Sequence, residues 1–176
     1  PISSAAICMA LGITGLAGGA AVAGCCAQMV GFAVMSFKEN RWGGLVSQGL
    51  GTSMLQMPNI IKNIRIWIPP ILASAITGPI ATCLFKLQMN GAPINSGMGT
   101  SGLCGQIGLI TGWLQPTIEN NPALGVDLAT AYANPAMNWI GLIVVSFIIP
   151  AVVALATSEF MRKKGWIVLG DYNLPK

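Results

Sequence analysis

Residues Asn95 to Trp113, NSGMGTSGLCGQIGLITGW, form the stretch that most restricts what this chain can fold into. The stretch has no charged residue and is apolar enough for a lipid bilayer, yet glycine recurs in it every two to four residues. Glycine leaves backbone amides exposed, and bare backbone survives at membrane depth only where protein buries it or where it lines a wet cavity. We therefore expect a re-entrant hairpin beside a solute site rather than a helix that faces lipid.

The composition of the chain indicates a membrane protein. Of its 176 residues, 53% are hydrophobic and 8% are charged, and the mean hydropathy is +0.68. A soluble protein has about 25% charged residues. The net charge of +4 is too small and too scattered to indicate a nucleic-acid partner. We predict an all-α integral membrane protein whose surroundings are the lipid bilayer.

A seven-residue motif, G-x-G-T-S-x-L, occurs twice in the chain. The first copy runs from Gly49 to Leu55 and the second from Gly97 to Leu103. Internal repeats are a known feature of transporter halves. Coincidence is the alternative in a chain with 22 glycines, although the Thr-Ser-x-Leu part does not depend on glycine abundance.

The cysteines and the first residues carry little functional signal. Histidine is absent, and no two of the five cysteines have zinc-ribbon spacing. We interpret the cysteines as buried reduced thiols that pack as small hydrophobic side chains, and we expect no metal and no cofactor. Pro1 is followed almost at once by apolar sequence without the basic region of a signal peptide. The chain therefore resembles a portion of a larger protein that lacks its N-terminal part.

Three stretches are apolar and long enough to cross a bilayer. The first lies at about residues 4–36, and as one helix it would reach roughly 50 Å, against about 30 Å of hydrocarbon. It must therefore tilt, break or begin outside the membrane core. The second covers residues 67–85, with a break at Gly78-Pro79, and the third covers residues 136–158, with a kink at Pro150.

Small residues recur at every fourth position of the first stretch, which predicts that other helices approach it closely. They are Gly15, Gly19, Ala23, Ala27 and Gly31. We expect this helix to be buried among others.

The segments between the spans follow from polarity and charge. Residues 42–60 are too polar and too short for a span, and we interpret them as interfacial or partly inserted. Residues 95–113 are the re-entrant hairpin, residues 119–134 a polar external loop, and residues 159–176 a tail. Basic residues concentrate between Lys38 and Arg65 and in the tail, so the positive-inside rule places both in the cytoplasm. Three crossings satisfy that bias, whereas a fourth crossing through the hairpin would not.

Neutral polar side chains accompany both motif copies and suit a polyhydroxylated solute. The candidate ligand-binding residues are Thr52, Ser53, Gln56, Asn59, Asn95, Ser96, Thr100, Ser101 and Gln106. The candidate hairpin glycines are Gly49, Gly51, Gly97, Gly99, Gly102 and Gly105. Loop amides with hydroxyls could also hold an anion. The alternative is that these hydroxyls cap broken helices and bond to nearby backbone. A P-loop is excluded because no Gly-Lys-Ser/Thr follows the glycines.

Three runs of sequence carry a resemblance to a known family. They are LVSQGLGTSMLQMPNIIKN (Leu45 to Asn63), WIPPILASAITGPIATCLFK (Trp67 to Lys86) and GAPINSGMGTSGLCGQIG (Gly91 to Gly108). They resemble the membrane-embedded EIIC-type family of the bacterial phosphotransferase system, most closely the branch that includes the membrane regulator of perfringolysin production. The resemblance covers nearly the whole chain, although family members extend further on the N-terminal side.

The resemblance implies a multi-pass protein of the bacterial inner membrane that forms a homodimer. It also implies a sugar path between scaffold helices and re-entrant hairpins. In the family, cytoplasmic EIIA and EIIB phosphocarrier subunits supply the phosphoryl group. The present chain would then be a portion of a larger EIIC-like fold.

The sequence departs from the sugar-phosphorylating members of that family. Those resemble one another in placing a membrane glutamate, often with a histidine, near the sugar hydroxyl. Here histidine is absent, and the acidic residues Glu39, Glu119, Asp127 and Glu159 lie at the ends of the expected spans or in loops. A carboxylate that activates a hydroxyl must lie within hydrogen-bond reach of it, so no catalytic residue can be named.

Two functions from different classes follow. The chain is either an EIIC-like permease component that binds and translocates a polar, sugar-like solute, or a membrane sensor or regulatory protein that binds a solute without phosphoryl transfer. A purely structural membrane subunit is a third alternative, which the polar motifs disfavour.

Overall fold

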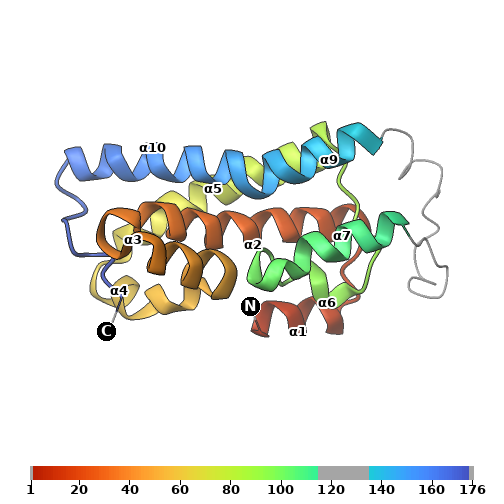
Figure 1. The fold of residues 1–176 in the computed structure, drawn as a ribbon, viewed down its shortest axis with the longest axis horizontal. Coiled ribbons are helices and arrows are strands. Elements are labelled where there is room, and N and C mark those ends of the chain that lie inside the picture. Colours follow the sequence, from red (N-terminus) through yellow and green to blue (C-terminus); the bar gives the residue numbers. More distant parts are fainter. Residues whose placement is uncertain (1, 115–134, 175–176) are drawn as a thin grey trace.

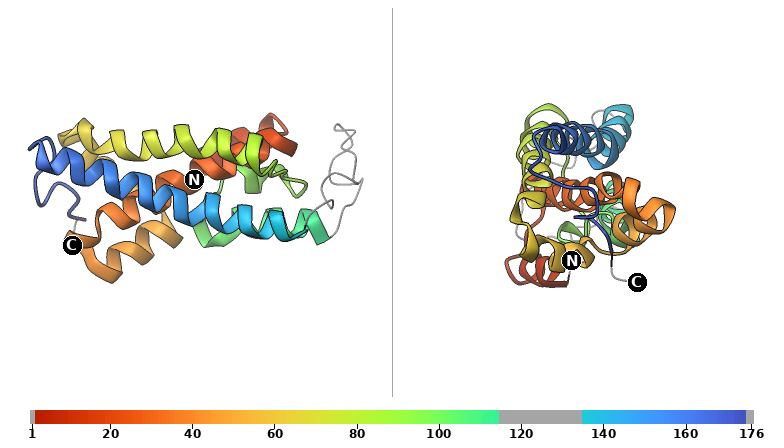
Figure 2. Two further views of the ribbon diagram at one scale, coloured as in Figure 1. Left: turned by 90° about the horizontal axis from the view of Figure 1, so that it is seen from above. Right: turned by 90° about the vertical axis from the view of Figure 1, so that its left-hand side faces the viewer.

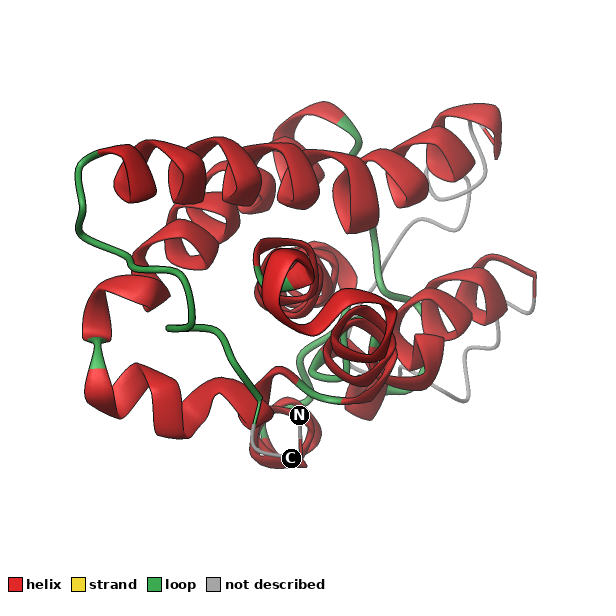
Figure 3. Ribbon diagram, turned by 60° about the vertical axis from the view of Figure 1, so that its left-hand side comes forward, coloured by secondary structure: helices red, strands yellow, loops and turns green. Residues whose placement is uncertain are grey.

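The computed structural model describes residues 2–114 and 135–174, and the regular elements of these residues are helices (Figure 3). A single pairing between Gly15 and Met89 is the strand-like contact among them. Three helical stretches are long and apolar enough to cross a membrane: Gly15–Met35, Ile64–Leu84 and Ala136–Lys163. The chain is therefore an all-α membrane protein with three candidate spans. The expected external loop at residues 119–134 lies outside the described residues.

Helix α2 (Gly15–Met35) occupies the centre of the molecule. It packs against α5 (Ile68–Pro79) and α10 (Ile149–Lys163), and these two helices also pack against each other. Figures 1 and 2 show α5 and α10 on one side of α2, with the short helix α9 (Pro135–Ile143) in line with α10 and the other short helices on the opposite side. Most side chains of α2 are buried, as expected for a helix surrounded by other helices.

The small residues of α2 explain how closely its neighbours approach. All five members of the predicted stripe are buried. A Cβ atom at Gly19 would collide with the carbonyl group of Leu87. A Cβ atom at Gly31 would lie 3.3 Å from the Cβ of Ala154 on α10. The predicted close packing of this helix face is confirmed.

The first expected span, residues 4–36, consists of two helices in the structure. Helix α1 (Ile2–Ala10) ends before residues 11–14, where Gly12 has a φ of +59° and Thr14 is extended. Positive φ is the conformation that glycine adopts most readily, so the break falls where the chain permits it. At 1.5 Å per residue, α2 alone reaches about 32 Å, close to the thickness of the hydrocarbon core.

In each of the other two spans a π-helical turn, which is wider than an α-helical turn, lies next to a proline. Helix α5 continues through Gly78 and Pro79 into the π-helical turn η4 (Ile80–Leu84), so the expected break is a widening of the helix. Helix α9 (Pro135–Ile143) passes through a second π turn, η7 (Val144–Ile148), which lies directly before Pro150 in α10. A proline ring clashes with the carbonyl group four residues earlier, which for Pro150 lies within the π turn η7, whereas η4 follows Pro79.

Residues 37–62 form a helical hairpin, called here the first hairpin. One arm consists of α3 (Phe37–Val46) and the π turn η1 (Ser47–Gly51). The other consists of the 3-10 turn η2 (Ser53–Gln56) and α4 (Met57–Lys62). Between the arms, Gln56 Nε2 donates a hydrogen bond of 3.0 Å to Gln48 Oε1. A further 3-10 turn, η3 (Ile64–Trp67), leads from this hairpin into α5.

Residues 93–114 form the second hairpin. Its short arm is α6 (Pro93–Ser96), and its long arm is α7 (Cys104–Leu114), preceded by the 3-10 turn η5 (Ser101–Leu103). The arms lie close together, because a Cβ atom at Gly108 would come within 2.5 Å of the Cβ of Asn95. The glycine-rich stretch therefore turns back on itself and is not one straight rod.

The two hairpins lie at opposite ends of the helix bundle and point toward its middle (Figure 1). The first hairpin lies at the end that we call the basic end, because Lys and Arg side chains of several segments gather there. They are Lys38, Arg41, Lys62, Arg65, Arg162, Lys163 and Lys164. The second hairpin begins near Lys86, at the other end.

Candidate functional site at the hairpin tips

The two copies of the repeated motif meet in the structure. Each copy occupies the tip of one hairpin, Gly49 to Leu55 in the first and Gly97 to Leu103 in the second. The Ser101 hydroxyl donates a hydrogen bond of 2.9 Å to the carbonyl oxygen of Gly51 and so joins the tips. Residues 50 positions apart in sequence are thus brought together at the middle of the bundle.

The two copies share part of their local structure. Thr52 and Thr100 each precede a 3-10 turn that starts at the motif serine and continues into an α-helix, α4 or α7. Their hydroxyls have different surroundings. Thr52 Oγ1 accepts a hydrogen bond of 3.2 Å from the Met54 amide, whereas Thr100 Oγ1 is buried and has no hydrogen-bond partner.

The motif glycines also differ between the copies. Gly99 has a φ of +57°, and a Cβ atom there would lie 2.7 Å from the Cβ of Cys25. The equivalent Gly51 faces open space, with no atom within 4 Å of such a Cβ. A Cβ atom at Gly97 would likewise lie 2.5 Å from the Ser4 backbone, whereas one at the equivalent Gly49 would be 3.5 Å from its nearest neighbour, the Cβ of Ala33.

Two further predicted glycines lie behind the second tip. Gly102 has a φ of +54°, a conformation that other residues rarely adopt. A Cβ atom at Gly105 would lie 2.6 Å from the carbonyl oxygen of Gly99. The second tip is therefore closely packed, and its glycines are required by that packing.

A half-open cleft of about 220 Å³ lies where both tips meet α1 and α2. Its lining residues come from four separate segments of the chain. They are Ser4, Cys25, Gln28, Met29, Ser53, Gly97 and Met98. Ser4 Oγ donates a hydrogen bond of 2.7 Å to the Gly97 carbonyl oxygen, which fixes α1 to the second tip. Of the predicted site residues, Ser53 and Gly97 line this cleft.

Other predicted residues of the first hairpin lie away from the cleft. Gln56 is fully buried, and its Oε1 accepts a hydrogen bond of 2.8 Å from Asn59 Nδ2. Both amides also donate to the last part of the chain, to the carbonyl oxygens of Tyr172 (3.0 Å) and Asn173 (2.8 Å). These two side chains hold another segment of the protein in this structure.

The predicted residues of the second hairpin are mostly internal. The Ser96 hydroxyl donates to the Ile13 carbonyl oxygen at 2.8 Å, and Gln106 Nε2 lies 3.2 Å from Cys26 Sγ. Gln106 Oε1, like Thr100 Oγ1, is buried without a partner. Asn95 packs against Gly108 of the opposite arm. The Ser96 hydroxyl thus bonds to backbone, although to a segment 83 positions earlier in the chain and not to its own.

Sequence reasoning missed the contribution of α1 and α2 to the cleft. Gln28 is held in place by hydrogen bonds with Trp67 Nε1 (3.3 Å) and Ser74 Oγ (3.2 Å). A signal was present, because Gln28 is an isolated amide in an otherwise apolar span, and polar groups within spans commonly mark solute paths. Ser4 and Cys25 had no comparable signal.

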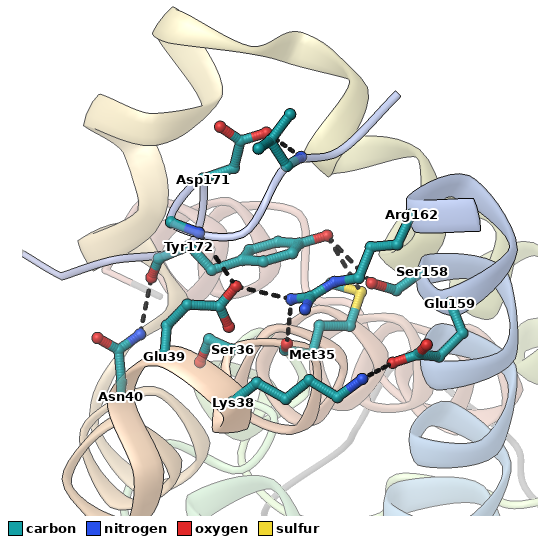
Figure 4. Close-up of polar contacts among 12 residues, drawn as sticks. Met35, Ser36, Lys38, Glu39, Asn40, Ser158, Glu159, Arg162, Asp171 and Tyr172 are labelled. Atoms are coloured by element: carbon teal, nitrogen blue, oxygen red, sulfur yellow. Dashed lines mark hydrogen bonds and ion pairs between the residues drawn. The ribbon is translucent and has the colours of Figure 1, made fainter. Parts of the chain in front are cut away.

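A buried ion pair at the basic end was also missed. Arg162 donates to Glu39 Oε1 at 2.8 Å, and the two side chains are 11% and 2% exposed (Figure 4). Arg162 also donates to the Met35 carbonyl oxygen at 3.2 Å and lies over the Tyr172 ring. Burial raises the pKa of Tyr172 to about 12. The sequence placed Glu39 at the end of a span and did not indicate that it would be buried.

The five cysteines are free thiols. Cys8 and Cys26 are buried, as expected, but the prediction of burial is wrong for Cys83, which is exposed on the surface of the second span. In residues 2–114 and 135–174, no three His, Cys, Asp or Glu side chains gather as a metal site requires.

Three candidate spans and two opposed hairpins with a small cleft between their tips define a multi-spanning helical membrane protein. The family model described as "Phosphotransferase system, EIIC" matches residues 1–174, and the chain belongs to this family. No match was found among curated proteins or among solved structures.

Proposed function

We propose that this chain is the membrane-embedded permease component of a sugar phosphotransferase system. In this proposal a polar, sugar-like solute binds in the cleft between the hairpin tips and is translocated past them. The observation that carries the proposal is the meeting of both motif copies, joined by Ser101 and Gly51, beside that cleft. Membership of the EIIC family supports a transporter-type component.

The chemistry of the cleft supports a small neutral solute. Ser4 and Ser53 supply hydroxyl groups, Gln28 supplies an amide, and the lining contains no charged side chain. Drug-sized ligands occupy pockets of about 300–1,000 Å³, so a cleft of about 220 Å³ suits a molecule of monosaccharide size.

In the same proposal both hairpins are re-entrant. Residues 42–51, which follow a kink at Arg41, reach about 15 Å and α7 about 17 Å, so each hairpin spans roughly half of a bilayer. The positive-inside rule places the basic end, with residues 159–176, in the cytoplasm of a bacterial inner membrane. The second hairpin then enters from the outer face. Family membership supports a homodimer and cytoplasmic EIIA and EIIB subunits as partners.

Substitutions at the tips test solute binding. We expect Ser53→Val and Ser101→Val to weaken binding of a hexose by about tenfold or more, because each removes a hydroxyl at the cleft or the tip contact. Thr100→Val should leave binding nearly unchanged, since its hydroxyl is fully buried and is not among the described groups that line the cleft. Thr111→Val is the matched control, because Thr111 lies exposed on α7 and its hydroxyl bonds to Ile107 of its own helix.

The measurement is isothermal titration of the purified protein with glucose, fructose, mannitol and N-acetylglucosamine. If a probe binds the wild-type protein and both serine variants equally well, the assignment of the site is wrong.

A sensor or regulatory protein of the same fold is the second candidate. It is favoured by the cleft lining, in which the described residues include no carboxylate and no histidine to activate a sugar hydroxyl. Uptake into vesicles with phosphoenolpyruvate and the soluble phosphocarriers separates the two candidates. Phosphorylated sugar inside the vesicles supports the permease, and binding without uptake supports the sensor.

A further inference from the structure

The last described part of the chain, residues 166–174, lies between the two arms of the first hairpin. Asn40 on α3 and Gln56 at the end of η2 both donate to the same carbonyl oxygen, that of Tyr172, at 2.7 and 3.0 Å. Asn40 Oδ1 also accepts a hydrogen bond of 3.0 Å from the Leu174 amide. The arms are thus connected through the backbone of another segment.

More bonds of the same kind continue along α4. Asn59 donates to the Asn173 carbonyl oxygen at 2.8 Å. Asn63 donates to Asp171 Oδ2 at 2.9 Å and to the Trp166 carbonyl oxygen at 3.3 Å. A row of side-chain amides on the first hairpin therefore binds an irregular peptide segment mainly through its backbone.

Buried side chains anchor the segment in place. Tyr172 is 0% exposed, and its hydroxyl lies 3.4 Å from Ser158 Oγ on α10 and 3.9 Å from Met35 Sδ on α2 (Figure 4). Ile167 is 2% exposed and belongs to the same apolar cluster as Tyr172. The segment is therefore held by the bundle on one side and by the first hairpin on the other.

We propose that residues 166–174 act as a strap that fastens the first hairpin to the bundle at the basic end, so that the hairpin moves only when the strap is released. Both hairpins pack against α2, but residues 166–174 bond to the first one, whereas the second is fixed by α1 and α2 at its glycines. Release of the strap would loosen the first tip while leaving the second in place, and would open the cleft toward the basic end.

Hydrogen–deuterium exchange of the full chain in detergent or nanodiscs tests the strap. Tyr172→Ala removes the anchor, and we expect exchange in residues 37–62 to rise by about tenfold or more, with residues 93–114 unchanged. Leu169→Ala is the matched control, because Leu169 lies in the same segment and is 76% exposed.

Adding a negative charge beside Asp171 tests the strap without opening a cavity. Asn63→Asp places two carboxylates where Asn63 now donates to Asp171, while Oδ1 can still accept from the Arg65 amide. We expect about tenfold faster exchange in residues 37–62. The double variant Asn63→Asp with Asp171→Asn should recover part of the wild-type protection, because the pair can bond again, whereas the bonds of Asn63 to the Trp166 carbonyl oxygen and of the Val168 amide to Asp171 Oδ2 are still lost. Exchange that rises equally in both hairpins, or in neither, would overturn the proposal.

Discussion

The two hairpins carry the same motif at their tips, but the protein holds them in different ways. The first packs against α2 and is held in addition by polar contacts: side-chain amides that bind residues 166–174, and the buried pair of Glu39 and Arg162. The second has no charged residue and is held by close packing of glycines against α1 and α2. The comparison teaches that a repeated sequence can serve one movable and one fixed element, because the surroundings decide which one can move.

Breaking the buried ion pair should show the largest effect on the first hairpin. Arg162→Met leaves the Glu39 carboxylate buried without its partner, which costs about 3–5 kcal/mol of stability. Lys38→Met is the control, because Lys38 pairs with Glu159 where both side chains are about half exposed, and such a pair contributes about 1 kcal/mol or less. Thermal unfolding in a mild detergent measures both. Equal losses would show that polar contacts do not hold the first hairpin.

A pair of glycine substitutions sharpens the comparison at the tips. Gly99→Ala combines a positive φ with a Cβ atom 2.7 Å from Cys25, and we expect it to cost about 2–4 kcal/mol. Gly51→Ala occupies the equivalent position, faces open space, and should change stability by less than about 0.5 kcal/mol. The same thermal unfolding assay applies. A neutral Gly99→Ala would mean that the second tip is not packed as described.

Alkaline pH should weaken the strap of the first hairpin. Tyr172 lies among Arg162, Glu39 and Asp171, and burial raises its pKa to about 12 from a usual value of 10.0. Between these pKa values Tyr172 loses its proton in the unfolded protein but keeps it in the folded protein. The free energy of unfolding therefore falls as the pH rises from 10 to 12. The slope is at most about 1.4 kcal/mol per pH unit. Tyr172→Phe should lack this component, and identical pH profiles for the two proteins would contradict the assignment.

Substitution of the two motif threonines should give the smallest change in stability, and only one of the two should be destabilising. Thr52→Val removes the hydroxyl that accepts from the Met54 amide and should cost about 1 kcal/mol. Thr100→Val replaces a buried hydroxyl that has no partner, so stability should be unchanged or slightly higher. Unfolding midpoints of the two variants, compared directly, decide the point. A larger loss for Thr100→Val would indicate a hydrogen bond that the structure does not show.

Much of the fold could be predicted because it follows from local properties. Apolar length gives the three candidate spans, and the density of uncharged glycine between Asn95 and Trp113 predicts that this stretch turns back. The small-residue stripe of α2 correctly predicts a buried helix, since close approach requires small side chains. These signals depend on few residues beyond the segment itself.

The candidate site was less predictable because it depends on distant segments. The contact between Ser101 and Gly51 requires two hairpins from opposite ends to have matching lengths. Gln56 and Asn59 looked like ligand-binding residues, but they bind residues that follow them by more than 110 positions. The burial of Glu39 depends on Arg162 in the same way. Neither periodicity nor composition reports such long-range contacts.

The meeting of the two tips is the central claim, and cysteine cross-linking in membranes tests it most directly. With the native cysteines replaced, Gly51→Cys and Ser101→Cys should form an intramolecular disulfide that mass spectrometry detects, because Ser101 Oγ lies 2.9 Å from the Gly51 carbonyl oxygen. Gly51→Cys with Leu169→Cys is the control pair. Efficient linking of the first pair alone is the predicted result. Linking no more efficient than in the control pair would contradict the account.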